Sequence, residues 1–147
     1  MTKHEIKVTN QSWKLIAAKD PTFEIQGNML FKNFFDMCPQ AMKIFNVKKD
    51  DNLMNNDKLR RHGALVLGVI DKCVSRDLKA NLQEFRDLGK RHIPRKVKPQ
   101  YFDMMGQAFV NTFQEILGEK AFTRDARAAW TKFFGIILSE MARNVIE

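Results

Sequence analysis

Hydrophobic residues recur every three or four positions through most of the chain, which is the spacing of one face of an α-helix. No stretch alternates between apolar and polar residues for long enough to indicate a β-strand. The pattern therefore predicts an all-α protein. The expected elements are a first helix that reaches Lys19 or Asp20, a helix over residues 21–37, a short turn over residues 39–45, two helices around His62 and His92, one over residues 99–117, and a last long helix.

Residues that commonly cap or break helices stand at the expected ends. Thr9 and Ser12, next to Trp13, are expected to cap the start of the first helix. The other expected boundaries are Pro21 for the second helix, Asn56 or Asp57 before the His62 helix, Pro99 and Gly118 around the next-to-last helix, and Thr123 before the last. Residues 46–56 are polar and contain no glycine, so we expect a mobile loop there.

Two histidines stand out because each shares a helix face with apolar residues. His62 continues the stripe of Leu59 and Val66, and His92 continues that of Phe85 and Leu88. Pro94 stops the second of these helices two residues after His92. The interval of thirty residues accommodates a connection that lets the two imidazoles face each other across a gap.

Three interpretations of this pair stay open on the residues alone. Two histidines on apolar faces are most often satisfied core residues, and periodicity by itself favours that interpretation. A zinc site needs three or four ligands, whereas the chain offers only His4 and two cysteines besides this pair. Two facing imidazoles between apolar walls suit haem, a flat and largely apolar cofactor held by an axial histidine.

Length and composition set wider bounds. A chain of 147 residues with 44% hydrophobic and 29% charged residues is expected to form a single domain over residues 1–147. It has no apolar run of 18 residues, and its polar start lacks the core of a signal peptide, so we expect a cytoplasmic protein without a membrane segment. Cys38 and Cys73 are interpreted as buried thiols.

The net charge of +8 comes from Lys and Arg scattered along the chain without a dense basic run. That distribution indicates a solvated surface and gives no sign of nucleic-acid binding.

The whole chain resembles a globin, from Trp13 in the first helix to Trp130 in the last. The resemblance includes Pro39 followed six residues later by Phe45, the family's pairing of a proline that opens the short third helix with a phenylalanine stacked on haem. It implies the globin fold, about eight helices around a haem pocket.

Further residues carry the same resemblance. Gly63 directly follows His62, and with Gly27 it would form the glycine contact where two globin helices cross. His92 followed by Val97 and Pro99 is similar to the proximal histidine and the corner after it.

The resemblance implies a role for each matching residue. His92 would be the proximal iron ligand and His62 the distal histidine, a hydrogen-bond donor to O₂ or a sixth ligand. Phe31, Phe45 and Val66 would line the ligand pocket. The remaining haem contacts would come from Leu88, Val97, Tyr101, Phe102 and Met105. The haem is expected to be non-covalent haem b, because the chain has no C-x-x-C-H motif.

Two features depart from the usual oxygen-storage pattern. Leu65 occupies a position where many such globins carry a basic residue for a haem propionate, so the propionates would pair with Arg91, Arg95, Lys96 or a lysine at 48 or 49. The interval from His92 to Val97 is one residue shorter than in vertebrate haemoglobin chains, as in neuroglobin and cytoglobin. The trio of Phe31, His62 and Val66 resembles neuroglobin.

The leading functional expectation is reversible O₂ binding for storage or transport, with CO and NO as further ligands. A redox enzyme acting on nitric oxide or nitrite is the first alternative and would need a reductase partner. A sensor with both histidines on iron is the second. A non-enzymatic role is favoured, and a homodimer stays open.

Overall fold

A computed structural model describes residues 1–48, 52–74, 78, 82–92 and 98–143. Within these ranges the chain forms α-helices and two short 3₁₀ helices and contains no strand, which confirms the all-α prediction. The elements are α1 (Lys3–Ala17), α2 (Glu24–Met37), η1 (Pro39–Phe45), η2 (Leu53–Asn55), α3 (Asp57–Val74), α4 (Leu82–His92), α5 (Pro99–Ala121) and α6 (Arg124–Ala142).

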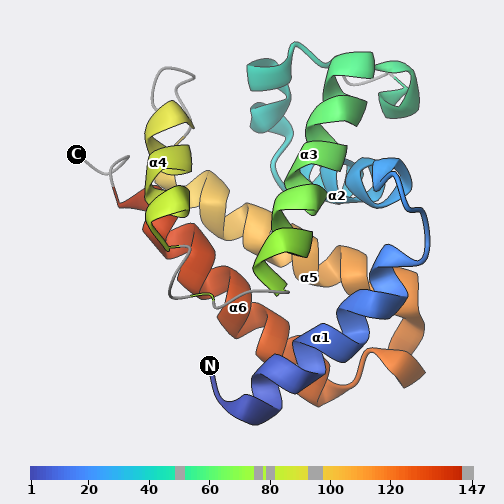
Figure 1. Ribbon diagram of the computed structural model, residues 1–147. Coiled ribbons are helices and arrows are strands. Elements are labelled where there is room, and N and C mark those ends of the chain that lie inside the picture. Colours follow the sequence, from blue (N-terminus) through green and yellow to red (C-terminus); the bar gives the residue numbers. More distant parts are fainter. Residues whose placement is uncertain (49–51, 75–77, 79–81, 93–97, 144–147) are drawn as a thin grey trace.

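The two longest helices, α5 and α6, pack against each other, and the other helices are arranged around this pair (Figure 1). α1 contacts both of them and also α3. α2 lies between α3 and α5, whereas α4 packs on α6. As a result α3 and α4 stand on the same side of the molecule but rest on different neighbours.

Aromatic side chains join α1, α5 and α6 into one core. The rings of Phe109 and Phe134 stack with centroids 4.3 Å apart, and Phe113 meets Trp130 edge-on at 4.8 Å. Trp130 is fully buried, and its Nε1 donates to Ser12 Oγ at 2.7 Å. The buried indole N–H is thereby satisfied, which removes the cost of an unpaired polar group in the core.

The predicted glycine crossing is present between α2 and α3. A Cβ placed on Gly27 would lie 2.7 Å from the carbonyl carbon of Gly63, and a Cβ on Gly63 would lie 3.0 Å from Cα of Gly27. The two backbones therefore touch, and a side chain at either position would push the two helices apart.

The predicted start of the first helix was wrong. α1 begins at Lys3, where the Thr2 side chain accepts from the backbone N–H of Glu5 and the Glu5 side chain accepts from the N–H of Thr2. This reciprocal capping box satisfies two N–H groups of the first turn. Thr9 and Ser12 lie inside the helix, and each donates its hydroxyl proton to a carbonyl of the preceding turn.

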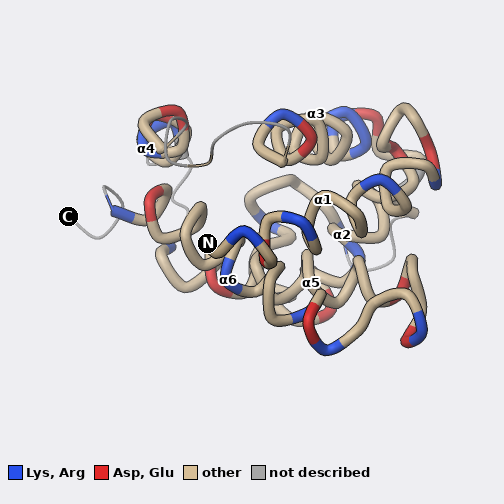
Figure 2. Tube along the Cα trace, turned by 60° about the horizontal axis from the view of Figure 1, so that its bottom comes forward, with Lys and Arg blue, Asp and Glu red and all other residues tan. Residues whose placement is uncertain are grey.

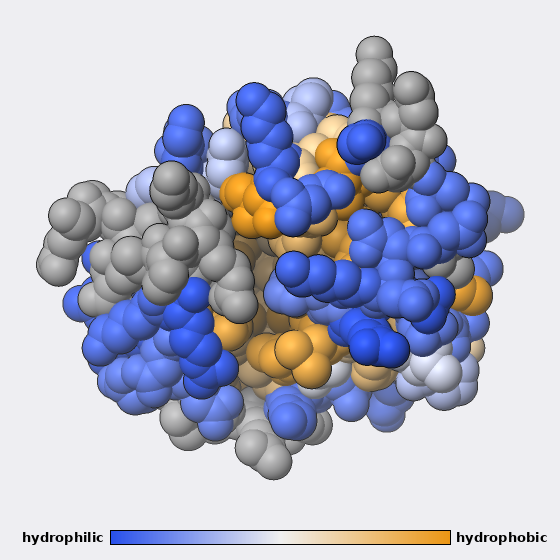
Figure 3. All heavy atoms as spheres, turned by 90° about the horizontal axis from the view of Figure 1, so that it is seen from above, coloured by the Kyte–Doolittle hydropathy of each residue, from blue (hydrophilic) through white to orange (hydrophobic). Residues whose placement is uncertain are grey.

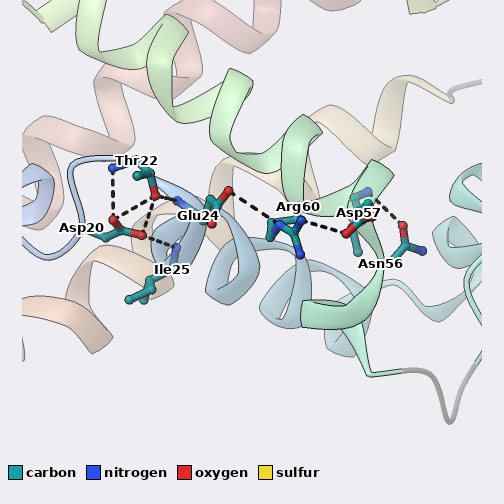
Figure 4. Close-up of polar contacts among 8 residues, drawn as sticks. Asp20, Thr22, Glu24, Ile25, Asn56, Asp57 and Arg60 are labelled. Atoms are coloured by element: carbon teal, nitrogen blue, oxygen red, sulfur yellow. Dashed lines mark hydrogen bonds and ion pairs between the residues drawn. The ribbon is translucent and has the colours of Figure 1, made fainter.

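The second helix also begins later than predicted, at Glu24 rather than at Pro21. Asp20 takes the capping role: its carboxylate accepts from the N–H groups of Thr22 at 3.0 Å and Ile25 at 3.1 Å (Figure 4). These backbone hydrogen bonds lower the pKa of Asp20. The preceding turn passes through Phe23 at a positive φ of 63°, which is incompatible with a continuous helix from Pro21.

The first helix ends at Ala17, before the predicted Lys19 or Asp20, but most of the other predicted boundaries are confirmed. η1 covers Pro39–Phe45, Asn56 Oδ1 accepts from the N–H of Leu59, and Thr123 Oγ1 accepts from the N–H of Ala126. Gly118 interrupts α5 with a φ of 76°. Residues 49–51 of the expected mobile loop lie outside the described residues, so its mobility stays a prediction.

Charged residues are distributed over the helices, with Lys and Arg interspersed among Asp and Glu (Figure 2). This matches the solvated surface expected from the sequence. Across the described part of the chain, every helix is too short or too polar to cross a bilayer.

Candidate functional site

A hydrophobic recess opens on the side of the molecule where α3 and α4 stand apart. Seen from above, apolar side chains gather in and around a hollow in the middle of this face, and polar side chains lie beside it on the described surface (Figure 3). α3 carries His62 in its second turn, and α4 ends at His92. The recess is therefore bordered by both helices that the sequence singled out.

The ring of His62 packs against two phenylalanines that come from other elements. Its centroid lies 5.7 Å from that of Phe31 on α2 and 5.6 Å from that of Phe45 at the end of η1. Phe31 is almost completely buried, and its ring meets Phe45 edge-on at 5.2 Å. The structure thus brings together three of the predicted pocket residues from three different elements.

Phe35 completes this aromatic group, although sequence reasoning did not assign it to the site. Its ring lies 5.8 Å from Phe31, one turn earlier on α2, and 5.9 Å from Phe45. Its spacing of four residues from Phe31 was the available signal. Phe35 supports the two rings that contact His62.

The other predicted haem contacts fall into two groups by burial. Tyr101 and Phe102 belong to the buried core at the start of α5. Phe45, Val66, Leu88 and Met105 are only half-buried although they pack against that core, and they come from η1, α3, α4 and α5. Apolar side chains left partly exposed on four elements fit a flat apolar group that would cover them, so the residues present are compatible with haem.

Several predicted residues lie where the structure gives no description. The side chain of His92 and residue Val97 are in this class, as are the propionate candidates Arg95 and Lys96 and Lys49 of the loop. Arg91 and Lys48 are described and exposed. Leu65 is 68% exposed and points away from the core.

Polar contacts attach the His62 helix to its neighbours at both ends. Arg60 in its first turn pairs with Asp57 at 2.8 Å and with Glu24 of α2 at 3.6 Å (Figure 4). Near the other end, Asp71 accepts from Nε1 of Trp13 on α1 at 2.7 Å. Together with the Gly27–Gly63 contact, these interactions fix α3 against α1 and α2.

The remaining histidine and the cysteines lie apart from this arrangement. His4 Nε2 approaches Asp125 Oδ2 at 3.4 Å, between the starts of α1 and α6. Cys38 and Cys73 are buried, as expected. Within the described ranges, His, Cys, Asp and Glu side chains do not gather in threes as metal-binding groups.

The fold and the aromatic group around His62 define the class of the protein: an all-α protein with an imidazole packed against two aromatic rings. A family model described as Globin matches residues 28–141. The chain belongs to the globin family, whose members hold haem and bind gaseous ligands.

Individual relatives point to two branches of that family. The chain is 30% identical to neuroglobin of Tetraodon nigroviridis over 80% of this chain and 77% of the relative. It is 28% identical to the haemoglobin anodic subunit beta of Gymnothorax unicolor over 90% of this chain and 89% of the relative. A second neuroglobin, from Dissostichus mawsoni, is 27% identical over 80% of this chain and 77% of the relative.

Proposed function

We propose that this protein binds O₂ reversibly, for storage or transport, at non-covalent haem b between α3 and α4. The observation that carries the proposal is the packing of His62 against Phe31 and Phe45, together with half-buried apolar side chains on α3, α4 and α5. Ferrous haem supplies the affinity for O₂, CO and NO when it is bound. The chain's own residues determine how those ligands are held and how water is kept out.

His92 is the residue that would hold the iron. It ends α4, and the recess lies between this helix and α3. A neutral imidazole is a good iron ligand, and the partner of its second nitrogen would tune its basicity. Leu88, one turn earlier, and Met105 of α5 would then contact the haem on the same side.

His62 would act on the ligand side. Its ring N–H would donate to O₂, whose oxygens carry partial negative charge, and would favour CO less. Phe31, Phe45 and Val66 form the apolar surroundings that would exclude bulk water and so slow oxidation to the ferric state. This arrangement suits reversible binding better than redox turnover, which would also require a reductase.

A structural observation bears on whether His62 itself binds the iron when no gas is present. Gly63, the next residue, is in backbone contact with Gly27. Moving α3 at this point would disturb that contact, so the close packing favours a sixth position left open to ligand. Sharp, split visible bands in the ferrous deoxy spectrum would instead identify His62 as a sixth ligand; one broad band is expected.

The test of the proposed function is a pair of substitutions in the haem-loaded protein. His92→Ala is expected to lose most haem affinity, whereas His62→Ala should retain haem, release O₂ faster and oxidise sooner. Haem retention is measured from the Soret band after gel filtration, and O₂ release by stopped flow. Equal haem retention and equal O₂ release in the two variants would refute the assignment of both histidines.

A further inference from the structure

The helix that ends at His92 rests mainly on α6. A Cβ placed on Gly89 would lie 2.8 Å from the carbonyl carbon and 2.9 Å from the Cα of Met141. The backbones of α4 and α6 are therefore in contact here, with no room for a side chain at Gly89. Phe85, one turn earlier on α4, is 2% exposed and belongs to the same core as Met141.

An ion pair joins the same two helices beside this contact. Nε of Arg86 donates to Oε2 of Glu140 at 2.6 Å, and the Glu140 side chain is only 17% exposed. Arg143, the C-cap residue of α6, approaches the same carboxylate oxygen at 3.3 Å. Glu140 thus has two cationic partners: Arg86, which belongs to α4, and Arg143, which does not.

The electrostatics of this group favour its charged form. The hydrogen bond from Arg86 lowers the pKa of Glu140, with a smaller contribution from Arg143, and Glu140 in turn raises the pKa of Arg86. Near neutral pH both partners are therefore ionised. A charge-assisted hydrogen bond of this kind is directional and about twice as strong as a neutral one.

Arg86 and Gly89 precede His92 by six and three residues on the same helix, which places Arg86 about 9 Å from His92 along the axis. An 11-residue helix moves largely as a rigid unit, so a displacement at Arg86 is transmitted to its last residue.

We propose that Arg86 and Glu140 form a positioning pair, which holds α4 on α6 so that His92 is placed to bind the haem iron. The inference rests on the proposed function of His92 and extends it to two residues that do not touch the haem. It predicts that the strength of the iron–histidine bond depends on a carboxylate of α6.

The experiment compares Glu140→Gln with two matched controls in the haem-loaded protein. Arg143→Gln removes the other cation on Glu140 without affecting the link to α4. Glu5→Gln removes a second ion pair of α6, from Glu5 to Lys132 at 3.1 Å, with a similarly covered carboxylate at 21% exposure. The readouts are haem transfer to an excess of apomyoglobin, amide hydrogen exchange in α4, and the iron–histidine stretching band after photolysis of the CO form.

Glu140→Gln is expected to raise the haem dissociation rate about tenfold, because the loss of a hydrogen bond to a charged group changes an equilibrium by a factor of about ten or more. It should also shift or broaden the stretching band and quicken exchange in α4. Both controls should stay within about twofold of the unsubstituted protein, since neither breaks the link to α4.

Substitutions at the other partner keep the proposal testable if Glu140→Gln folds poorly. Arg86→Gln should reproduce the effect, and Arg86→Lys should restore part of it because the charge remains. If Glu140→Gln and Arg86→Gln match the controls while His92→Ala loses haem, the positioning role is refuted and the function of His92 stands. If His92→Ala retains haem, the proposed function itself fails.

Discussion

The helices on the two sides of the recess are attached in different ways. α3, with His62, is fixed by a backbone contact at Gly63 and by polar contacts to both α1 and α2. α4, with His92, has a backbone contact at Gly89 and the Arg86–Glu140 ion pair among its described attachments, both to α6. α3 and α4 can therefore be loosened independently. Substitutions that loosen α3 should change gas-binding rates, and substitutions that loosen α4 should change haem loss and the iron–histidine stretching band.

The largest expected effect on the α3 side comes from Phe31→Ala. Phe31 is 1% exposed and contacts His62, Phe35 and Phe45, so its loss should cost about 3–5 kcal/mol if the cavity does not collapse. The new space lies beside His62, and association of O₂ and CO should quicken. Flash photolysis and urea unfolding measure the two effects.

Because α3 and α4 are attached separately, Phe31→Ala should leave the iron–histidine stretching band unchanged. A shifted band would show that the two walls are coupled. Unchanged association rates would place Phe31 outside the ligand pocket.

Next in size is the pair Gly27→Ala and Gly89→Ala. Either Cβ would meet backbone atoms at less than 3.0 Å, so two helices must separate, at a cost of about 1–3 kcal/mol. Gly27→Ala is expected to change gas-binding rates through α3, and Gly89→Ala to speed haem loss through α4. Stopped-flow kinetics and haem transfer distinguish the two outcomes.

Gly68→Ala is the matched control on α3, because a Cβ at Gly68 would meet nothing within 4 Å. It should stabilise the protein by about 0.5–1 kcal/mol through helix propensity alone. A loss of stability in this variant would show that the contact distances do not explain the effects at Gly27 and Gly89.

Asp71→Ala tests the polar attachment of α3 to α1. It leaves the N–H of Trp13, a residue that is 5% exposed, without this acceptor and should lower the free energy of unfolding by about 1–3 kcal/mol. Asp71→Asn retains an acceptor oxygen and should recover most of the loss. Equal destabilisation by both substitutions would mean that the negative charge, rather than the hydrogen bond, is what matters.

The smallest effect is the pH dependence of the α4 attachment. The folded pKa of Glu140 is lowered below its ordinary value of 4.5, so its contribution to stability is complete above pH 4.5 and is lost as the pH falls through the folded pKa. The stability deficit of Glu140→Gln should therefore be constant from about pH 5 to 7 and shrink below pH 4.5. Urea unfolding of both proteins across this range provides the measurement.

The deficit of Gly27→Ala should show no such trend, because a backbone contact carries no titrating group. If the stability deficit of Glu140→Gln stayed constant down to pH 3, the ionised Glu140 carboxylate would not be what stabilises the attachment of α4.

Much of the fold was predictable because the signals are local. Apolar spacing located the helices, and Asn56, Gly118 and Thr123 marked their ends through contacts within one turn. The early part of the chain was predicted less well. Thr9 and Ser12 are as suitable for a cap as Thr2, and only the full helix shows that the Ser12 hydroxyl faces Trp130 instead.

For the site, the sequence by itself determined which side chains were available: two histidines on apolar helix faces, the aromatic residues around them, and two glycines suited to a close crossing. Only the tertiary structure decided which of them meet. Arg86 and Glu140 are 54 positions apart, and Trp13 and Asp71 are 58 apart, so no periodicity links them. Such pairings follow from how the helices pack, because helix spacing constrains neighbours within about one turn and carries no information on which helix will lie opposite.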